Sequence, residues 1–104
     1  MYLLTDQFPP REIYGLTSQM RRAVTSIAAN IAEGNARDST KDYLRHLAIA
    51  QGSLAELETF LVLAEQLRYC TGDVVAELMT QCQEEGRMLN GLQTRLRAKL
   101  TPDP

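Results

Sequence analysis

The chain has 104 residues and a formal net charge of −2, with 44% hydrophobic and 23% charged residues. These values are typical of one globular domain, and they argue against disorder and against two independent cores. No run of about 18 apolar residues suggests a membrane span, and the N-terminus lacks the pattern of a signal peptide. We therefore expect a cytoplasmic protein without a membrane partner. Cys70 and Cys82 are too few for a disulfide framework, and we expect both to be reduced.

The first part of the chain predicts a helical stub followed by a full helix. Residues 1–7 are typical of the last turns of a helix, which ends before Pro9 and Pro10 because proline cannot continue a helix interior. Over about residues 17–33 apolar residues recur at steps of three and four, which predicts a helix. We expect Thr17 or Ser18 to cap its start and Gly34 to end it in a left-handed conformation.

A central helix is expected over about residues 40–68, beginning at the S-x-x-D capping box of Ser39 and Asp42. Its apolar seam consists of Tyr43, Leu47, Ala50, Leu54, Leu57, Leu61 and Ala64. Apolar residues also flank this seam on both sides, which is more surface than one antiparallel partner can cover. The helix is therefore predicted to contact several neighbours, some of them from other subunits. Gly52 and Ser53 are expected to mark a close helix crossing.

The last helix is expected over about residues 74–100, with Thr71 or Asp73 as its cap. Asn90 and Gly91 form the dipeptide of a hairpin turn, but the flanking residues keep a helical period. Glu85 interrupts the apolar seam, so it is either paired or placed at the edge of the bundle. The predicted fold is all-α: a single antiparallel up-down bundle over residues 1–104, of the four-helix type with its first helix shortened to a stub.

Basic residues outnumber acidic ones between Arg11 and His46, whereas the rest of the chain is acidic. This skew predicts phosphate contacts without base reading, and the candidate nucleic-acid-binding residues are Arg37, Lys41, Arg45, Arg21 and Arg22. The alternative is a solvated helix face on which Arg21 or Arg22 forms ion pairs. Its acidic partner would then be Glu33, Glu56 or Glu58.

Reactive constellations are missing from the sequence. His46 is the only histidine and has no second ligand at metal-binding spacing, so a surface or core histidine is the better interpretation. No serine or cysteine has an identifiable histidine and carboxylate partner, and there is no phosphate-binding glycine loop. We therefore expect no enzyme activity, no metal site and no cofactor.

Three runs carry a family resemblance: YGLTSQMRRAVTSIAANIAEGNAR (residues 14–37), STKDYLRHLAIAQGSLAELET (residues 39–59) and GRMLNGL (residues 86–92). In this order they resemble the bacterial four-helix-bundle proteins encoded in intervening sequences of large-subunit ribosomal RNA genes. The accessory variability protein of diversity-generating retroelements is similar to that group. The resemblance of this chain to the accessory variability protein implies a homopentameric barrel with a basic surface that binds nucleic acid and a reverse transcriptase. The resemblance to the intervening-sequence proteins implies only an association with ribosomal RNA loci.

Members of this family usually carry a full first helix before the segment that matches residues 1–9, and only its end is present here. Either the start of the chain is truncated or the bundle has an open groove. An uncovered groove would expose more apolar surface than a monomer normally tolerates, which favours aggregation or filling by another chain.

Charge and resemblance together favour a non-catalytic homo-oligomer, pentameric by resemblance, that binds RNA or DNA through phosphate contacts. Its primary contacts would come from Arg37, Lys41 and Arg45. The alternative is a scaffold that docks a partner protein such as a polymerase and does not itself contact nucleic acid. A structural product with no dedicated ligand is a third interpretation, which the negative net charge supports.

Overall fold

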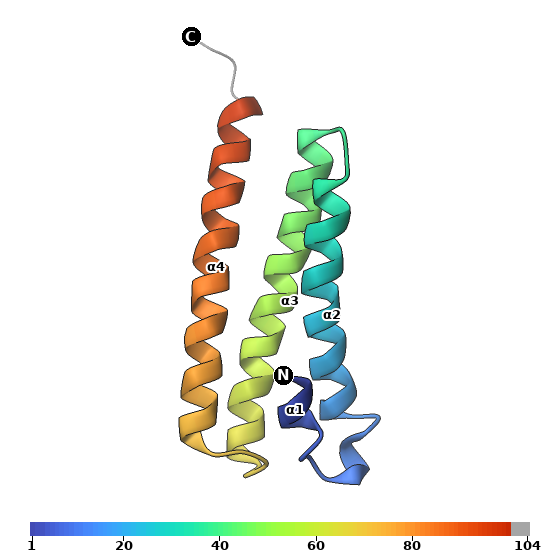
Figure 1. The fold of residues 1–104 in the computed structure, drawn as a ribbon, viewed down its shortest axis with the longest axis vertical. Coiled ribbons are helices and arrows are strands. Elements are labelled where there is room, and N and C mark those ends of the chain that lie inside the picture. Colours follow the sequence, from blue (N-terminus) through green and yellow to red (C-terminus); the bar gives the residue numbers. More distant parts are fainter. Residues whose placement is uncertain (101–104) are drawn as a thin grey trace.

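The computed structural model describes residues 1–100, and the regular structure among them is entirely helical (Figure 1). The elements are α1 (Tyr2–Thr5), the short 3-10 helix η1 (Pro10–Glu12), α2 (Leu16–Asn35), α3 (Thr40–Gln66) and α4 (Gly72–Leu100). The three long helices run alternately up and down, and α3 packs against both α2 and α4. The prediction of an all-α, antiparallel up-down bundle with a short first helix is confirmed.

The core is built around the seam of α3. From Leu47 to Ala64 every predicted seam residue is buried, while Tyr43 is half-buried. The residues that meet this seam come from α1, from the segment after it and from the two flanking helices: Leu4, Phe8, Leu16, Met20, Ala23, Ile27, Val75, Cys82, Leu89 and Leu96. Burial of apolar area from two sides is the main favourable contribution to such a bundle.

Side chains cap the starts of α3 and α4 as predicted. The Ser39 hydroxyl accepts a hydrogen bond from the Asp42 N–H at 3.2 Å, and the Thr71 hydroxyl accepts one from the Val74 N–H at 3.4 Å. The start of α2 differs from the prediction. Its N-cap is Gly15, and the Glu12 carboxylate accepts a hydrogen bond from the Leu16 N–H at 3.4 Å. A cap by Thr17 or Ser18 was therefore the wrong expectation.

Gly34 does not end α2, which corrects a second expectation. The helix continues to Asn35, and no glycine within residues 1–100 has a positive φ. Gly34 is buried against α3, where an added Cβ would lie 2.8 Å from the His46 Cβ and 2.9 Å from the Tyr43 Cδ1. Its role is close helix packing. Gly52 and Ser53 were expected at such a crossing. The Ser53 hydroxyl lies 2.8 Å from the Ser26 hydroxyl of α2, whereas Gly52 is exposed and an added Cβ there would meet no atom within 4 Å.

The helix α3 ends at Gln66, and Arg68, the residue after its C-cap Leu67, has a φ of 63°. The Arg68 N–H donates to the Glu65 carbonyl and the Tyr69 N–H donates to the Ala64 carbonyl, both at 2.9 Å. These two bonds define a Schellman motif, in which glycine usually occupies the left-handed position. Arginine therefore adopts a conformation that is costly for a residue with a Cβ.

Tyr69 links the two connections at the end of the bundle opposite the α2–α3 turn. Its hydroxyl donates to the Glu12 carboxylate at 2.6 Å, and its ring centroid lies 5.3 Å from that of Phe8. The Arg11 guanidinium carbon is 6.0 Å from the same ring. The hydrogen bond from Tyr69 lowers the pKa of Glu12 and raises the pKa of Tyr69. The α1–α2 connection is thus held to the α3–α4 turn.

Both cysteines carry free thiols. Cys82 is buried on the α4 seam as predicted, and burial raises its pKa to about 11, with a further contribution from the Glu58 and Glu85 carboxylates. Cys70 is half-buried, and burial also raises its pKa. Because the thiolate is the reactive form, Cys82 behaves as a small apolar residue of the core.

One described helix, α3, is long and apolar enough by length and composition to cross a membrane. Polar residues such as Gln51 and Ser53 interrupt its apolar run, which is why no membrane span was expected from the sequence. This is weak support for a membrane span, since the core helix of a soluble bundle passes the same test. The packing of α3 between α2 and α4 accounts for its composition.

We expect the substitution Gly34→Ala to lower the free energy of unfolding by about 1 kcal/mol, because overpacking against His46 and Tyr43 exceeds the gain in helix propensity. Gly52→Ala is the matched control. It adds the same methyl group in open space and should raise the free energy of unfolding by about 0.5–1 kcal/mol. Urea denaturation followed by circular dichroism measures both changes. Changes of the same sign would contradict the close approach at Gly34.

Arg68→Gly should raise the free energy of unfolding by about 0.5–1 kcal/mol, because glycine adopts a positive φ without a Cβ clash. Gln66→Gly, two residues earlier and still helical, should lower it by about 0.5–1 kcal/mol. Thermal denaturation of the two variants beside the parent protein tests the pair. A destabilised Arg68→Gly protein would contradict the Schellman geometry.

Candidate nucleic-acid interface

The α2–α3 connection and the first turns of α3 carry the three basic residues that were predicted as the primary phosphate contacts. Arg37 lies in the connection, Lys41 is in the first turn of α3 and Arg45 is one turn further on. All three are exposed. The Ser39 cap positions them, because it fixes where α3 begins and therefore which way its first turn faces. The structure thus brings these three predicted residues together at one end of the bundle.

A buried polar group lies beneath Arg45. His46 is 5% exposed, and its Nδ1 is 3.0 Å from the Asn30 Oδ1 while its Nε2 is 3.3 Å from an Arg45 guanidinium nitrogen. Arginine only donates, so Nε2 accepts and Nδ1–H donates to Asn30. The Asn30 amide in turn donates to the Ser26 carbonyl at 2.9 Å. His46 is therefore a core histidine, which is one of the two alternatives expected from the sequence. It also accepts a hydrogen bond from the Arg45 guanidinium.

Arg45 is also near an acidic neighbour. Its Nε lies 3.9 Å from a carboxylate oxygen of Asp42, with 59% of the arginine side chain exposed. An exposed pair at this distance contributes little to stability and is screened by salt. The guanidinium therefore remains accessible to an external anion.

The C-terminal end of α4 brings further cations to the same end of the molecule. The buried Gln93 side chain donates to the Gln51 Oε1 at 2.5 Å, which sets the register of α4 against α3. Because the two helices are antiparallel, the residues after Gln93 lie beside the start of α3 (Figure 1). Arg95, Arg97 and Lys99 thereby join the set, although Arg97 also contacts the Gln93 Oε1 at 3.4 Å.

We call these six residues the basic end: Arg37, Lys41, Arg45, Arg95, Arg97 and Lys99. Residues 33–45 and 93–100, which contain it, carry six cations and three carboxylates, whereas residues 1–32 and 46–92 carry five cations and nine carboxylates. A chain of net negative charge therefore has one end of opposite sign. The sequence analysis missed the three α4 residues, and the signal that would have found them was the antiparallel order of helices of similar length.

Arg21 and Arg22 do not belong to the basic end. Both lie on α2 about 15 residues before Arg37, which is roughly 22 Å along a helix axis. Arg21 bonds the Asp6 carboxylate at 2.6 Å and the Thr5 hydroxyl at 2.9 Å, so it fastens the segment of α1 to α2. This ion pair is with Asp6 and not with any of the three glutamates considered from the sequence. Arg22 is exposed.

Within residues 1–100 no group of three His, Cys, Asp or Glu side chains is arranged to hold a metal ion. The basic end consists of exposed cations from the α2–α3 connection, the start of α3 and the end of α4. Such an arrangement can attract and contact an anionic backbone, which is the chemistry of phosphate binding.

Comparison with known proteins gives one family match. The family model described as 23S rRNA-intervening sequence protein matches residues 1–91. No curated protein matches the chain. The match spans α1, α2, α3 and most of α4, and it includes the connection that carries Arg37, Lys41 and Arg45. The chain belongs to the 23S rRNA-intervening sequence protein family.

Proposed function

We propose that the protein is a non-catalytic, self-associating bundle whose basic end binds the phosphate backbone of RNA or DNA. The observation that carries this proposal is the convergence of six cations from the α2–α3 connection, the start of α3 and the end of α4. Residues 37–45 contain three of these cations, and residues 95–99 contain the other three. The surrounding acidic surface would confine a polyanion to this end of the molecule.

The contacts would be to phosphates rather than to bases. The cations are long, exposed side chains at the end of a bundle, and among residues 1–100 that end is formed by the termini of α2, α3 and α4 and by one short connection (Figure 1). Phosphate contacts position a nucleic acid without reading its sequence. We therefore expect weak sequence preference and strong dependence on salt.

Family membership supports RNA as the physiological target. The family description refers to an intervening sequence of 23S rRNA. Arg37, Lys41 and Arg45 lie inside the matched range, whereas Arg95, Arg97 and Lys99 lie beyond it.

Self-association is supported by the exposed apolar face of α3. Ile49, Leu63 and Leu67, on one side of the seam, and Val62, on the other side, are each between 41% and 46% exposed in the isolated chain. Large apolar side chains left exposed beside a buried seam are typical of a contact between proteins. Several basic ends in one assembly would bind one polyanion more tightly than a single end, because the later contacts are intramolecular.

The test is fluorescence anisotropy with a labelled RNA hairpin and a DNA duplex over a series of KCl concentrations. Replacing Arg37, Lys41 and Lys99 with glutamine should weaken binding roughly 10- to 100-fold near 0.1 M salt, because three counterion-releasing contacts are lost. The slope of log Kd against log salt should fall by about 2 to 3 in the same variant.

A matched control removes three charges elsewhere, with Arg11, Arg22 and Arg68 replaced by glutamine. It has the same net charge as the first variant, so it should bind within about twofold of the parent if position matters more than total charge. Light scattering on both variants checks that the assembly is unchanged. Equal losses in the two variants, or binding that does not respond to salt, would contradict the proposal.

A further inference from the structure

His46 connects the basic end to a buried chain of polar side chains between α2 and α3. His46 is 5% exposed, whereas the Arg45 side chain beside it is 59% exposed. The ring Nδ1 lies 3.0 Å from the Asn30 Oδ1, and the ring Nε2 lies 3.3 Å from an Arg45 guanidinium nitrogen. From Asn30 the chain continues to the Ser26 hydroxyl at 3.2 Å, which lies 2.8 Å from the Ser53 hydroxyl. The imidazole therefore lies between a buried network and a surface cation.

The hydrogen bonds of Asn30 determine which nitrogen of neutral His46 carries the proton. The Asn30 amide group donates to both the carbonyl and the hydroxyl of Ser26, so its Oδ1 is the atom that faces the ring. An amide oxygen only accepts, and the ring Nδ1 must therefore donate. The Nε2 of the neutral ring carries a lone pair, which accepts the hydrogen bond from Arg45. Neutral His46 thus occupies one N–H group of a cation that belongs to the basic end.

Protonation of His46 reverses this contact, because an imidazolium donates from both ring nitrogens. Its Nε2–H has no lone pair to offer Arg45, and two like charges at 3.3 Å repel each other. The Nδ1 side of the ring tolerates the added charge. The Asn30 Oδ1 still accepts there, and a Glu33 carboxylate oxygen 3.9 Å from Nδ1 offsets the positive charge. The expected consequence of protonation is release of the Arg45 guanidinium toward solvent.

The charged groups around the ring come from two helices. Glu33 of α2 and Arg45 of α3 face it directly, and Asp42 of α3 lies 3.9 Å from the Arg45 Nε. Among the described residues, α4 places no ion-pair partner beside His46. The side chains of Glu33 and Asp42 are both more than half exposed, so salt screens their attraction for cations. Asp42 is therefore a weak competitor for a released Arg45.

A phosphate oxygen has the chemistry that the protonated ring requires. It accepts hydrogen bonds and carries negative charge, so one phosphate can accept from the imidazolium Nε2–H and from the guanidinium together. Without an external anion, the Nε2–H of this buried ring has no acceptor within residues 1–100, since its neighbour there, Arg45, only donates. Protonation of His46 and binding of a phosphate therefore favour each other.

We propose that His46 and Arg45 form a proton-linked phosphate subsite of the basic end. When His46 is neutral it holds the Arg45 guanidinium, and when it is protonated both side chains donate to a phosphate of the bound nucleic acid. The proton comes from solvent and returns to solvent when the phosphate leaves. Affinity for the polyanion therefore rises as the pH falls from about 8 to about 5, the range in which histidine changes charge. This subsite presupposes the phosphate binding proposed for the basic end and adds its regulation by pH.

The first test is fluorescence anisotropy with a labelled RNA hairpin at about pH 8 and about pH 6, at one KCl concentration. The parent protein should bind at least about fivefold more tightly at the lower pH, which is the low end of ordinary coupling between linked sites. His46→Gln should change less than about twofold, because glutamine keeps a donor and an acceptor but does not titrate. His46 is the only histidine, and burial raises the pKa of both Cys70 and Cys82, so no other side chain is expected to change charge in this range. Circular dichroism at both pH values checks that each protein is folded.

A pair of arginine variants separates the subsite from general charge. Arg45→Gln removes the guanidinium that protonation would release, so its ratio of affinities at the two pH values should fall to about twofold or less, from the imidazolium charge alone. Arg37→Gln is the matched control. It also removes one cation of the basic end but leaves the contact between Arg45 and His46 intact, so it should keep the ratio of the parent. Equal ratios in the two variants would overturn the proposal.

NMR of the labelled protein reads the state of the ring without nucleic acid, because the signals of the only histidine are unambiguous. At about pH 8 the neutral ring should carry its proton on Nδ1, and an Nε2–H tautomer would overturn the proposal. Adding RNA at about pH 7 should move the ring signals toward the protonated form, because linkage between two sites is reciprocal. RNA binding without a pH response contradicts the subsite alone. No RNA binding at either pH, with the Nδ1–H tautomer present, contradicts phosphate binding at the basic end and the subsite with it.

Discussion

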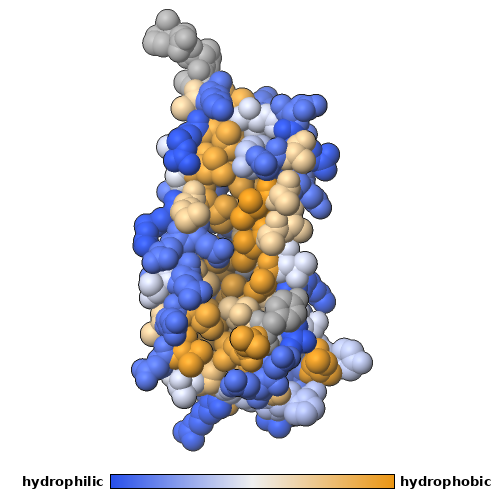
Figure 2. Space-filling model, in the orientation of Figure 1, coloured by the Kyte–Doolittle hydropathy of each residue, from blue (hydrophilic) through white to orange (hydrophobic). Residues whose placement is uncertain are grey.

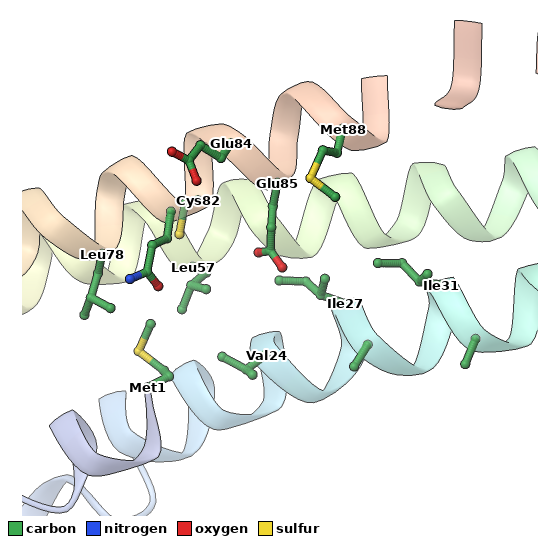
Figure 3. Close-up of a pocket in the computed structure, with 13 residues that line it drawn as sticks. Met1, Val24, Ile27, Ile31, Leu57, Leu78, Cys82, Glu84, Glu85 and Met88 are labelled. Carbon is green, nitrogen blue, oxygen red and sulfur yellow. The ribbon is translucent and has the colours of Figure 1, made fainter. Parts of the chain in front are cut away.

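The apolar seam of α3 is the constraint on which the rest of the structure depends. It runs from Leu47 to Ala64 without a polar interruption, and α2 and α4 each bury one side of it. Because α3 lies between them, no Cα atom of α2 lies within 8 Å of a Cα atom of α4. The two outer helices and Met1 line a groove of about 620 Å³, which Figure 2 shows as an apolar strip and Figure 3 shows in close-up.

The same antiparallel packing separates the charges of the chain. The α2–α3 connection and the C-terminus of α4 are far apart in sequence, but they meet at one end because each helix reverses direction. The buried Gln51–Gln93 hydrogen bond fixes the level at which they meet. Partial negative charge at the C-terminus of α4 further favours Arg97 and Lys99 in its last turn. The basic end is therefore a product of helix order and register rather than of overall composition.

At the opposite end, polar contacts hold the connections in place. Tyr69 joins Glu12 across the bundle, and Arg21 joins the segment of α1 to α2. These contacts occupy side chains that the sequence alone would suggest are available to bind a ligand. Arg21 was a candidate for phosphate binding, but its guanidinium is bonded to Asp6 and Thr5. Whether a surface arginine is available to a ligand thus depends on which segment packs beside it.

The sequence by itself determined the helices, the seam of α3 and the basic α2–α3 connection, because helical periodicity and N-terminal caps are local properties that a few neighbouring residues express. Tertiary structure alone decided three things. Gly34 serves close packing because α3 approaches α2 there, and Arg21 pairs with Asp6 because α1 docks beside it. The α4 cations reach the basic end because α4 returns antiparallel to α3. Each of these depends on residues distant in the chain, which local patterns cannot place relative to one another.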